Sequence, residues 1–174
     1  MTEFLVYDVF TDRAFSGNPL AVIPDAKGLR EDELEAIARE FNFSETTFVY
    51  PSEDPGHTAK VRNFTPAREL RFAGHPTIGP AIALAELGRA GAEMVLELGV
   101  GPILVKVDGT HARFETRVPL FLGEAPSVEA VARCIGQSKD AIRTDRHSPV
   151  LAGLGPILFW WSLPAKRRLV RLRA

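Results

Sequence analysis

Hydrophobic and polar positions in the first 120 residues follow two different periods. Short runs rich in β-branched and aromatic residues, such as "FLVYDVF", "TTFVY" and "AKVRNF", predict strands. Residues 30–41 instead repeat their apolar positions at helical spacing and carry acids in the first turn. The apolar face of this segment consists of Leu34, Ile37, Ala38 and Phe41. We therefore expect an amphipathic helix that lies on an outer surface, among several strands.

A second helix is predicted over residues 77–87, and its pattern differs from that of the first. Its residues are apolar nearly all round, and Glu86 is the only charged residue before the closing Gly88. A helix without a polar face has to be enclosed on all sides. We expect it to run through the middle of a barrel-like sheet, which gives an α+β fold.

The chain beyond this helix returns to strands and then predicts one more helix. Residues 94–116 alternate between apolar and polar and contain Asp108-Gly109, a strong hairpin signal. Ser127 is a suitable cap for a helix that ends near Gly136. Cys134 lies in this helix, and we expect it to be a small buried apolar residue.

Composition narrows the class of protein. With 174 residues, 45% of them hydrophobic, the chain suits one domain or one and a part. Its net charge of -1 gives no overall attraction to nucleic acid or membrane. The single cysteine permits no internal disulfide, and no secretory leader is seen, so we expect a cytoplasmic protein.

The last part of the chain combines an apolar run with a basic tail. Residues 149–163 are apolar but shorter than the ~20 residues of a membrane helix, and Pro156 interrupts them. We therefore expect one or two buried strands here rather than an interfacial anchor. The five basic residues of the tail are expected to be solvated and not to bind nucleic acid. They are Lys166, Arg167, Arg168, Arg171 and Arg173.

Metal binding is not expected from the histidine spacing. His57, His75, His111 and His147 lie far apart and form no pair four residues apart. His57 and His147 stand in turn-like surroundings, where we expect them to be exposed.

Candidate chemistry begins at the start of the enclosed helix. Gly74, His75, Pro76 and Thr77 precede or open it, and no acidic side chain caps it. The unpaired N–H groups of a first helical turn attract anions, and a glycine permits close approach. This favours a site for a substrate carboxylate beside a titratable imidazole. The alternative is that the histidine is only a capping or core residue.

A second candidate lies at Ser44 and Glu45, between the outer helix and an apolar strand. A lone glutamate is usually exposed and inert. If the fold closes it into an apolar cleft, Glu45 would become a general acid/base near neutral pH.

Three segments together resemble a known family. They are "AFSGNPLAV" (14–22), "NFSETTFV" (42–49) and "RNFTPARELRFAGHPTIG" (62–79). In this order and spacing they resemble the first half of the PhzF-like phenazine-biosynthesis isomerases, which share the diaminopimelate-epimerase fold. A fainter resemblance continues into residues 127–160.

The resemblance implies two similar halves, each a β-barrel around a central helix, with the active site between them. It implies that Glu45 and His75 are catalytic and that no cofactor is needed. Glu45 would move a proton between carbons of a small carboxylic acid. Where diaminopimelate epimerases carry a cysteine, this chain has Ala73, which favours the glutamate-based branch.

The resemblance also implies substrate contacts. Ser44, Gly74 and the start of the central helix, with Pro76 and Thr77, would bind the substrate. Asn18 would line the cleft, because the family keeps its Gly-Asn-Pro turn near the site. The alternative for Asn18 and Pro19 is a purely structural turn.

The chain departs from the family in its second half. The Asp-Pro-Val-Thr-Gly-Ser-like motif of that half does not occur in the sequence. We therefore expect an N-terminal domain over residues 1–118 and a truncated second domain over 119–174, from an intact or a disrupted reading frame. An inactive homologue or a carboxylate-binding module is the alternative to an enzyme. We also expect a homodimer, because apolar strands around Phe159, Trp160 and Trp161 would otherwise be uncovered.

Overall fold

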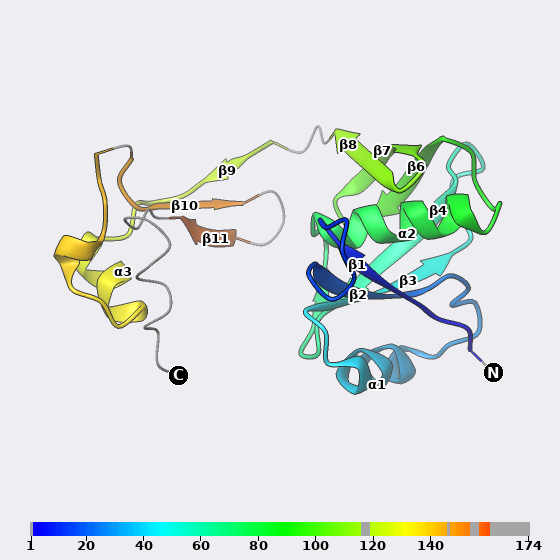
Figure 1. Ribbon diagram of the computed structural model, residues 1–174, viewed down its shortest axis with the longest axis horizontal. Helices are drawn as coiled ribbons and strands as arrows, with labels where there is room; N and C mark the ends of the chain where they lie inside the picture. The colour runs from blue at the N-terminus through cyan, green and yellow to red at the C-terminus, as the bar shows by residue number, and fades with distance from the viewer. Residues whose placement is uncertain (1, 116–118, 146, 154–156, 161–174) are drawn as a thin grey trace. The chain divides into compact units, whose positions relative to one another are not determined.

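The structure, a computed structural model, describes residues 2–115, 119–145, 147–153 and 157–160. The chain divides into two compact units, Met1–Val118 and Pro119–Ala174. Each unit is described by itself (Figure 1).

The first unit is a strongly curved sheet around one helix. Its strands follow the order β1-β2-β3-β4-β6-β7-β8, and the short β5 pairs with β4. Most neighbouring strands are antiparallel, whereas β2 with β3 and β4 with β6 are parallel. The strands are β1 (Leu5–Val9), β2 (Asn18–Ile23), β3 (Glu45–Tyr50), β4 (Ala59–Phe64), β5 (Glu69–Leu70), β6 (Glu93–Leu98), β7 (Gly101–Asp108) and β8 (His111–Glu115).

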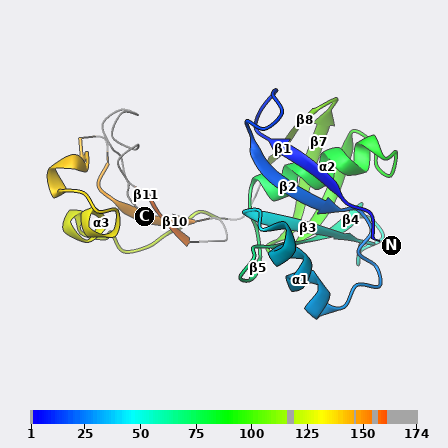
Figure 2. The ribbon, with the colours of Figure 1, turned by 60° about the horizontal axis from the view of Figure 1, so that its bottom comes forward.

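Helix α2 (His75–Glu86) is the enclosed helix. It contacts β1, β2, β3, β4, β6, β7 and β8, and the two ribbon views show it inside the curve of the sheet (Figures 1 and 2). Nine of its residues are buried, as its apolar sequence predicts. It begins two residues earlier and ends one residue earlier than predicted. A Cβ at Gly79 would overlap the buried Leu20 side chain of β2, so the glycine permits this close approach.

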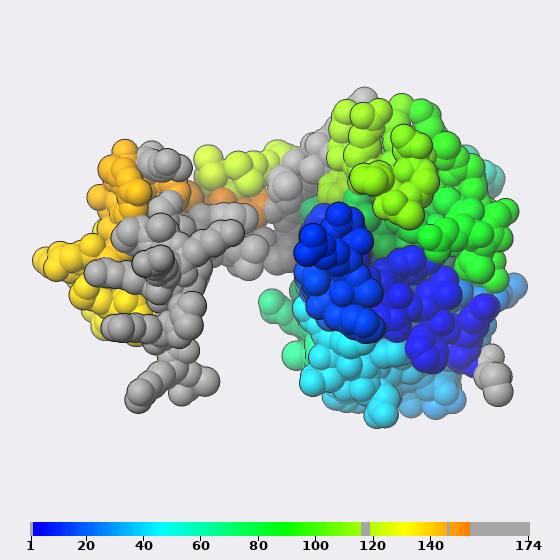
Figure 3. Space-filling model, viewed as in Figure 1, coloured from blue at the N-terminus to red at the C-terminus, as the bar shows by residue number. Residues whose placement is uncertain are grey.

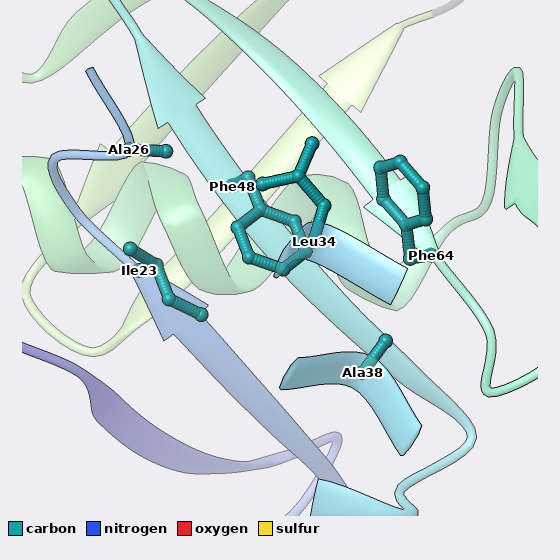
Figure 4. Close-up of a cluster of buried hydrophobic side chains, with 6 residues drawn as sticks. All are labelled: Ile23, Ala26, Leu34, Ala38, Phe48 and Phe64. Atoms are coloured by element: carbon teal, nitrogen blue, oxygen red, sulfur yellow. The ribbon is translucent and has the colours of Figure 1, made fainter. Parts of the chain in front are cut away.

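Helix α1 (Glu31–Phe41) covers the opposite face of the sheet. Leu34 and Ala38 are buried there, while Ile37 and Phe41 are partly buried, which confirms the predicted apolar face. Figure 4 shows the cluster that they form with the sheet: Ile23, Ala26, Leu34, Ala38, Phe48 and Phe64. Since side chains alternate along a strand, Phe48 points to α1 and the odd-numbered residues of β3, Glu45 included, point to α2.

Local signals in the first unit were mostly correct. The predicted hairpin joins β7 to β8, with Asp108 opposite His111 and Gly109 in the left-handed region at φ 57°. The predicted turn at residues 17–19 is wrong in position. Asn18 and Pro19 already belong to β2, opposite Val9 and Asp8, and the turn lies before them.

The second unit is a smaller sheet with one short helix. It contains β9 (Phe121–Leu122), α3 (Val128–Cys134), a 3-10 turn η1 (Lys139–Ala141), β10 (Val150–Gly153) and β11 (Ile157–Trp160), and the sheet order is β11-β10-β9. Ser127 caps α3 as predicted, since its hydroxyl accepts the Ala130 N–H at 3.1 Å. One or two strands were predicted in the apolar run, and two are present, β10 and β11.

The buried position predicted for Cys134 is wrong, because this residue is exposed. The buried residues of α3 are Val131 and Ala132, and Cys134 lies on another face of the helix. The side chains of Phe159 and Trp160, and residue Trp161, lie outside what the structure describes. Within the described residues, no helix is long and apolar enough to cross a membrane.

Candidate active site

Glu45 and His75 meet inside the first unit. Glu45 is the first residue of β3 and His75 the first of α2, so two element starts bring them together. Glu45 Oε2 lies 3.2 Å from His75 Nε2, and the side chains are only 15% and 8% exposed. The two atoms are not aligned as a hydrogen bond, and neither has another hydrogen-bond partner among the described residues. A buried carboxylate oxygen and a buried ring nitrogen thus lie side by side without the hydrogen-bond partners that buried polar atoms usually have.

Asn18 and Ser44 extend this pair into a chain of four side chains. The Asn18 amide nitrogen lies 3.2 Å from His75 Nδ1. The Ser44 hydroxyl donates to Asn18 Oδ1 at 2.9 Å. The parallel pairing of β2 and β3, with Leu20 opposite Glu45, places these residues at one end of the sheet. The structure therefore brings together Asn18, Ser44, Glu45 and His75, all of which were sequence candidates.

The start of α2 has no side-chain cap and no acid in its first turn. Pro76 has no N–H, and the Thr77 N–H donates to Gly74 O at 3.1 Å. The Thr77 hydroxyl is also occupied, because it donates to Ala73 O at 2.8 Å. Thr77 is fully buried, whereas nothing lies within 4 Å of the position of a Cβ on Gly74. Donors for an anion at this helix start would thus come from Gly74 and His75.

Burial sets the charge state of the imidazole. It lowers the pKa of His75 below its ordinary value of 6.5, and the nearby Glu45 carboxylate opposes this effect. We therefore take His75 to be neutral at pH 7. A neutral imidazole carries one proton and can donate a hydrogen bond from only one of its two nitrogens.

Phe10 is a neighbour of the site that sequence reasoning missed. Its ring stands edge-on to the His75 ring, with 6.3 Å between centroids, and it is 76% exposed. Phe10 and Phe15 both have left-handed backbones, at φ 65° and 63°, which is rare for bulky residues. Asp8 Oδ2 accepts the Phe15 N–H at 2.7 Å and fixes this loop (Figure 3, in blue). The signal in the sequence was two phenylalanines on either side of a short polar turn.

Asn63 is a second residue that was missed. It is fully buried, and neither its amide nitrogen nor its amide oxygen has a partner among the described residues. It lies opposite Thr47 on the α2-facing side of the sheet, the side that carries Glu45. An amide in the apolar pattern of β4 was the available signal.

Elsewhere in the first unit, several charged side chains are paired with one another. A groove of about 820 Å³ is lined by His57, Lys60 and Arg62 together with acidic residues. Lys60 pairs with Glu53, and His57 Nδ1 lies 2.9 Å from Glu97 Oε1. His57 is partly buried rather than exposed as predicted. Within the described residues, no three His, Cys, Asp or Glu side chains are grouped as metal ligands would be.

Comparison with known proteins identifies the family of the chain. The family model for phenazine biosynthesis-like proteins, PhzC-PhzF, matches residues 7–156. The chain belongs to this family. An uncharacterized isomerase of Mesorhizobium japonicum is 46% identical over 152 residues, which cover 83% of this chain and 50% of the relative. The family predicted from the three sequence segments is confirmed.

Two further relatives add a named activity and a solved structure. The trans-2,3-dihydro-3-hydroxyanthranilate isomerase of Pseudomonas aeruginosa is 40% identical over 122 residues, 69% of this chain and 44% of that protein. The structure of a predicted epimerase from the same species is 27% identical, with a TM-score of 0.83 over 95% of this chain and 60% of that one. The α+β epimerase-like fold is thereby confirmed. The chain spans about half the length of the curated relatives it matches.

Proposed function

We propose that this chain carries the acid/base site of a cofactor-independent isomerase that moves a proton on a small carboxylic acid. The observation that supports this most strongly is the Glu45–His75 pair. Its two facing atoms are 3.2 Å apart, buried and without other hydrogen-bond partners among the described residues. Buried acid/base groups left open to a ligand are typical of functional sites.

The proposed reaction needs two roles, and the geometry offers a residue for each. Glu45 takes a proton from a carbon next to a conjugated carboxylate, and the electron pair of the broken C–H bond moves into the conjugated system. The protonated Glu45 then returns the proton to a different carbon. His75 donates a hydrogen bond to the oxygen on which charge develops.

The substrate carboxylate is proposed to lie at the start of α2. The helix dipole and the N–H groups of Gly74 and His75 favour an anion there. No atom lies within 4 Å of the position that a Cβ on Gly74 would take, so a ligand has room to approach the backbone closely there. Ser44 and Asn18 complete the polar side of the proposed site, and Phe10 forms its exposed apolar rim.

Solvent deuterium incorporation tests this proposal. The compound named for the curated relatives, trans-2,3-dihydro-3-hydroxyanthranilate, would be incubated in deuterated water and followed by NMR. We expect carbon-bound deuterium with the wild type and a loss of about 10²- to 10⁴-fold with Glu45→Gln. Glu35→Gln is the matched control, because Glu35 is an exposed residue of α1 that pairs with Arg39 on the same helix.

Two other results of the deuterium assay would contradict parts of this proposal. Binding without exchange in the wild type would select the carboxylate-binding module. Exchange that is equal in wild type and Glu45→Gln would overturn the proposed role of Glu45. Light scattering on the same samples tests the proposed homodimer, which a monomer at all concentrations would contradict.

A further inference from the structure

The Asn18 side chain lies between two groups that constrain its orientation. On one side its amide nitrogen faces His75 Nδ1 at 3.2 Å. On the other side its oxygen accepts the Ser44 hydroxyl at 2.9 Å. Both contacts join residues that are far apart in sequence. The pairing of β2 with β3 and the position of the start of α2 bring these residues together.

This arrangement decides which nitrogen of His75 carries the proton. An amide NH₂ can only donate, so a nitrogen that faces it at hydrogen-bond distance must accept. Nδ1 of His75 therefore has no hydrogen. In a neutral imidazole the remaining proton is then on Nε2, the nitrogen that faces Glu45 Oε2 at 3.2 Å.

The opposite orientation of the Asn18 amide is disfavoured by Glu45. Its oxygen would then require a hydrogen on Nδ1, and the neutral ring would present a bare Nε2 to Glu45. A bare, electron-rich Nε2 and a carboxylate oxygen would then lie 3.2 Å apart in a buried place, which is electrostatically unfavourable although the atoms are not in line, unless an additional proton were bound. The Ser44 hydroxyl can donate or accept and so fits either orientation. The carboxylate of Glu45 is therefore what selects the first one.

We propose that Asn18 is a positioning residue that fixes His75 as the neutral tautomer protonated on Nε2. Ser44 keeps the Asn18 amide in place by donating to its oxygen. His75 then presents an N–H donor beside Glu45, and Glu45 remains the base. The tautomer rests on the geometry alone, whereas its catalytic meaning rests on the proposed function.

Nitrogen-15 NMR of histidine-labelled protein tests this directly at about pH 8, where an ordinary histidine is neutral. For His75 we expect an unprotonated Nδ1 and a protonated Nε2. His57 is an internal reference for the opposite tautomer, because its Nδ1 faces the Glu97 carboxylate at 2.9 Å and must carry a hydrogen. The His75→Gln variant identifies the signals of His75.

The Asn18→Asp variant distinguishes a positioning role of Asn18 from a merely structural one. Aspartate has nearly the shape of asparagine but only accepts at this position, so we expect the proton of His75 to move to Nδ1 or the ring to become fully protonated. Ser44→Ala should shift the tautomer in the same direction but less. The His57 signals should be unchanged in both variants, which also shows that the unit is folded.

Two results would overturn the proposal: a protonated Nδ1 of His75 in the wild type, or an unchanged His75 tautomer in folded Asn18→Asp. Neither result depends on substrate. The deuterium assay with Glu45→Gln can therefore fail while the tautomer is as proposed, and the reverse also holds.

Discussion

Two histidine–glutamate pairs lie in the first unit, and they differ in how completely their atoms are hydrogen-bonded. In the His57–Glu97 pair, Nδ1 lies 2.9 Å from the carboxylate. The same carboxylate also accepts the backbone N–H groups of Glu53 and Asp54, both at 2.8 Å. In the His75–Glu45 pair, the facing atoms are 3.2 Å apart and without hydrogen-bond partners among the described residues. The His75 side chain is 8% exposed against 23% for His57, whereas both glutamates are 15% exposed.

The difference distinguishes a pair whose carboxylate is fully hydrogen-bonded from the pair that we propose to be functional. Glu97 closes the loop after β3 onto β6, and all its contacts are made within the fold. Glu45 keeps a buried oxygen without an aligned hydrogen bond, which costs stability and fits the proposed role, in which a ligand supplies the missing partner. A histidine beside a glutamate therefore does not by itself indicate a functional site. The hydrogen-bond partners of the two side chains distinguish the two pairs.

The largest effect is expected from removing each histidine in turn. His75→Gln should lower deuterium exchange by about 10²- to 10³-fold, because a flexible amide replaces the imidazole N–H that is held beside Glu45. His57→Gln should leave the exchange rate near that of the wild type. Equal losses in the two variants would remove the distinction between the pairs.

Displacement of α2 should affect one pair and spare the other. In Gly79→Ala the new methyl group overlaps the buried Leu20, so the free energy of unfolding should fall by about 1–3 kcal/mol and His75 should shift away from Glu45. Chemical denaturation and the deuterium assay measure the two effects. Gly91→Ala is the matched control, because nothing lies within 4 Å of its Cβ position. An unchanged Gly79→Ala protein would contradict the packing described for α2.

Acid should destabilise the protein through Glu97. Backbone N–H groups of Glu53 and Asp54, together with His57, lower the pKa of Glu97 from its ordinary 4.5 to about 2. A carboxylate with a lowered folded-state pKa adds stability above pH 4.5, which is lost as the pH falls towards 2. Melting temperatures across this range should fall more steeply for wild type than for Glu97→Gln. Parallel curves would show that Glu97 is not held as described.

The smallest effect is expected for the stability of Glu45→Gln. Because the substitution removes a buried charge with a free oxygen, the free energy of unfolding should stay the same or rise by about 0.5–1 kcal/mol. Thermal unfolding followed by circular dichroism measures it. A clear loss of stability would mean that Glu45 is held by contacts like those of Glu97.

Sequence patterns predicted the elements whose causes are local. The apolar face of α1, the hairpin at Asp108 and the Ser127 cap each depend on residues a few positions apart. The enclosure of α2 followed from its lack of polar residues. Cys134 was wrongly predicted to be buried, because the few apolar residues of a short helix do not define which of its faces is buried.

The candidate site was predictable only as a set of residues. The motifs indicated Asn18, Ser44, Glu45 and His75, but not which atoms would face each other. Those distances depend on the pairing of β2 with β3 and on where α2 enters the sheet, which no local pattern encodes. The left-handed backbone of Phe10 and the buried amide of Asn63 likewise arise from tertiary packing.

The most direct test compares Glu45→Gln with Glu97→Gln in deuterium exchange and thermal unfolding, measured side by side. The account predicts opposite outcomes. Glu45→Gln should lose exchange and keep its melting temperature, while Glu97→Gln should keep exchange and melt at a lower temperature. If both variants lose exchange and stability together, or if Glu45→Gln loses only stability, the claim that Glu45 and His75 form an open acid/base pair is contradicted.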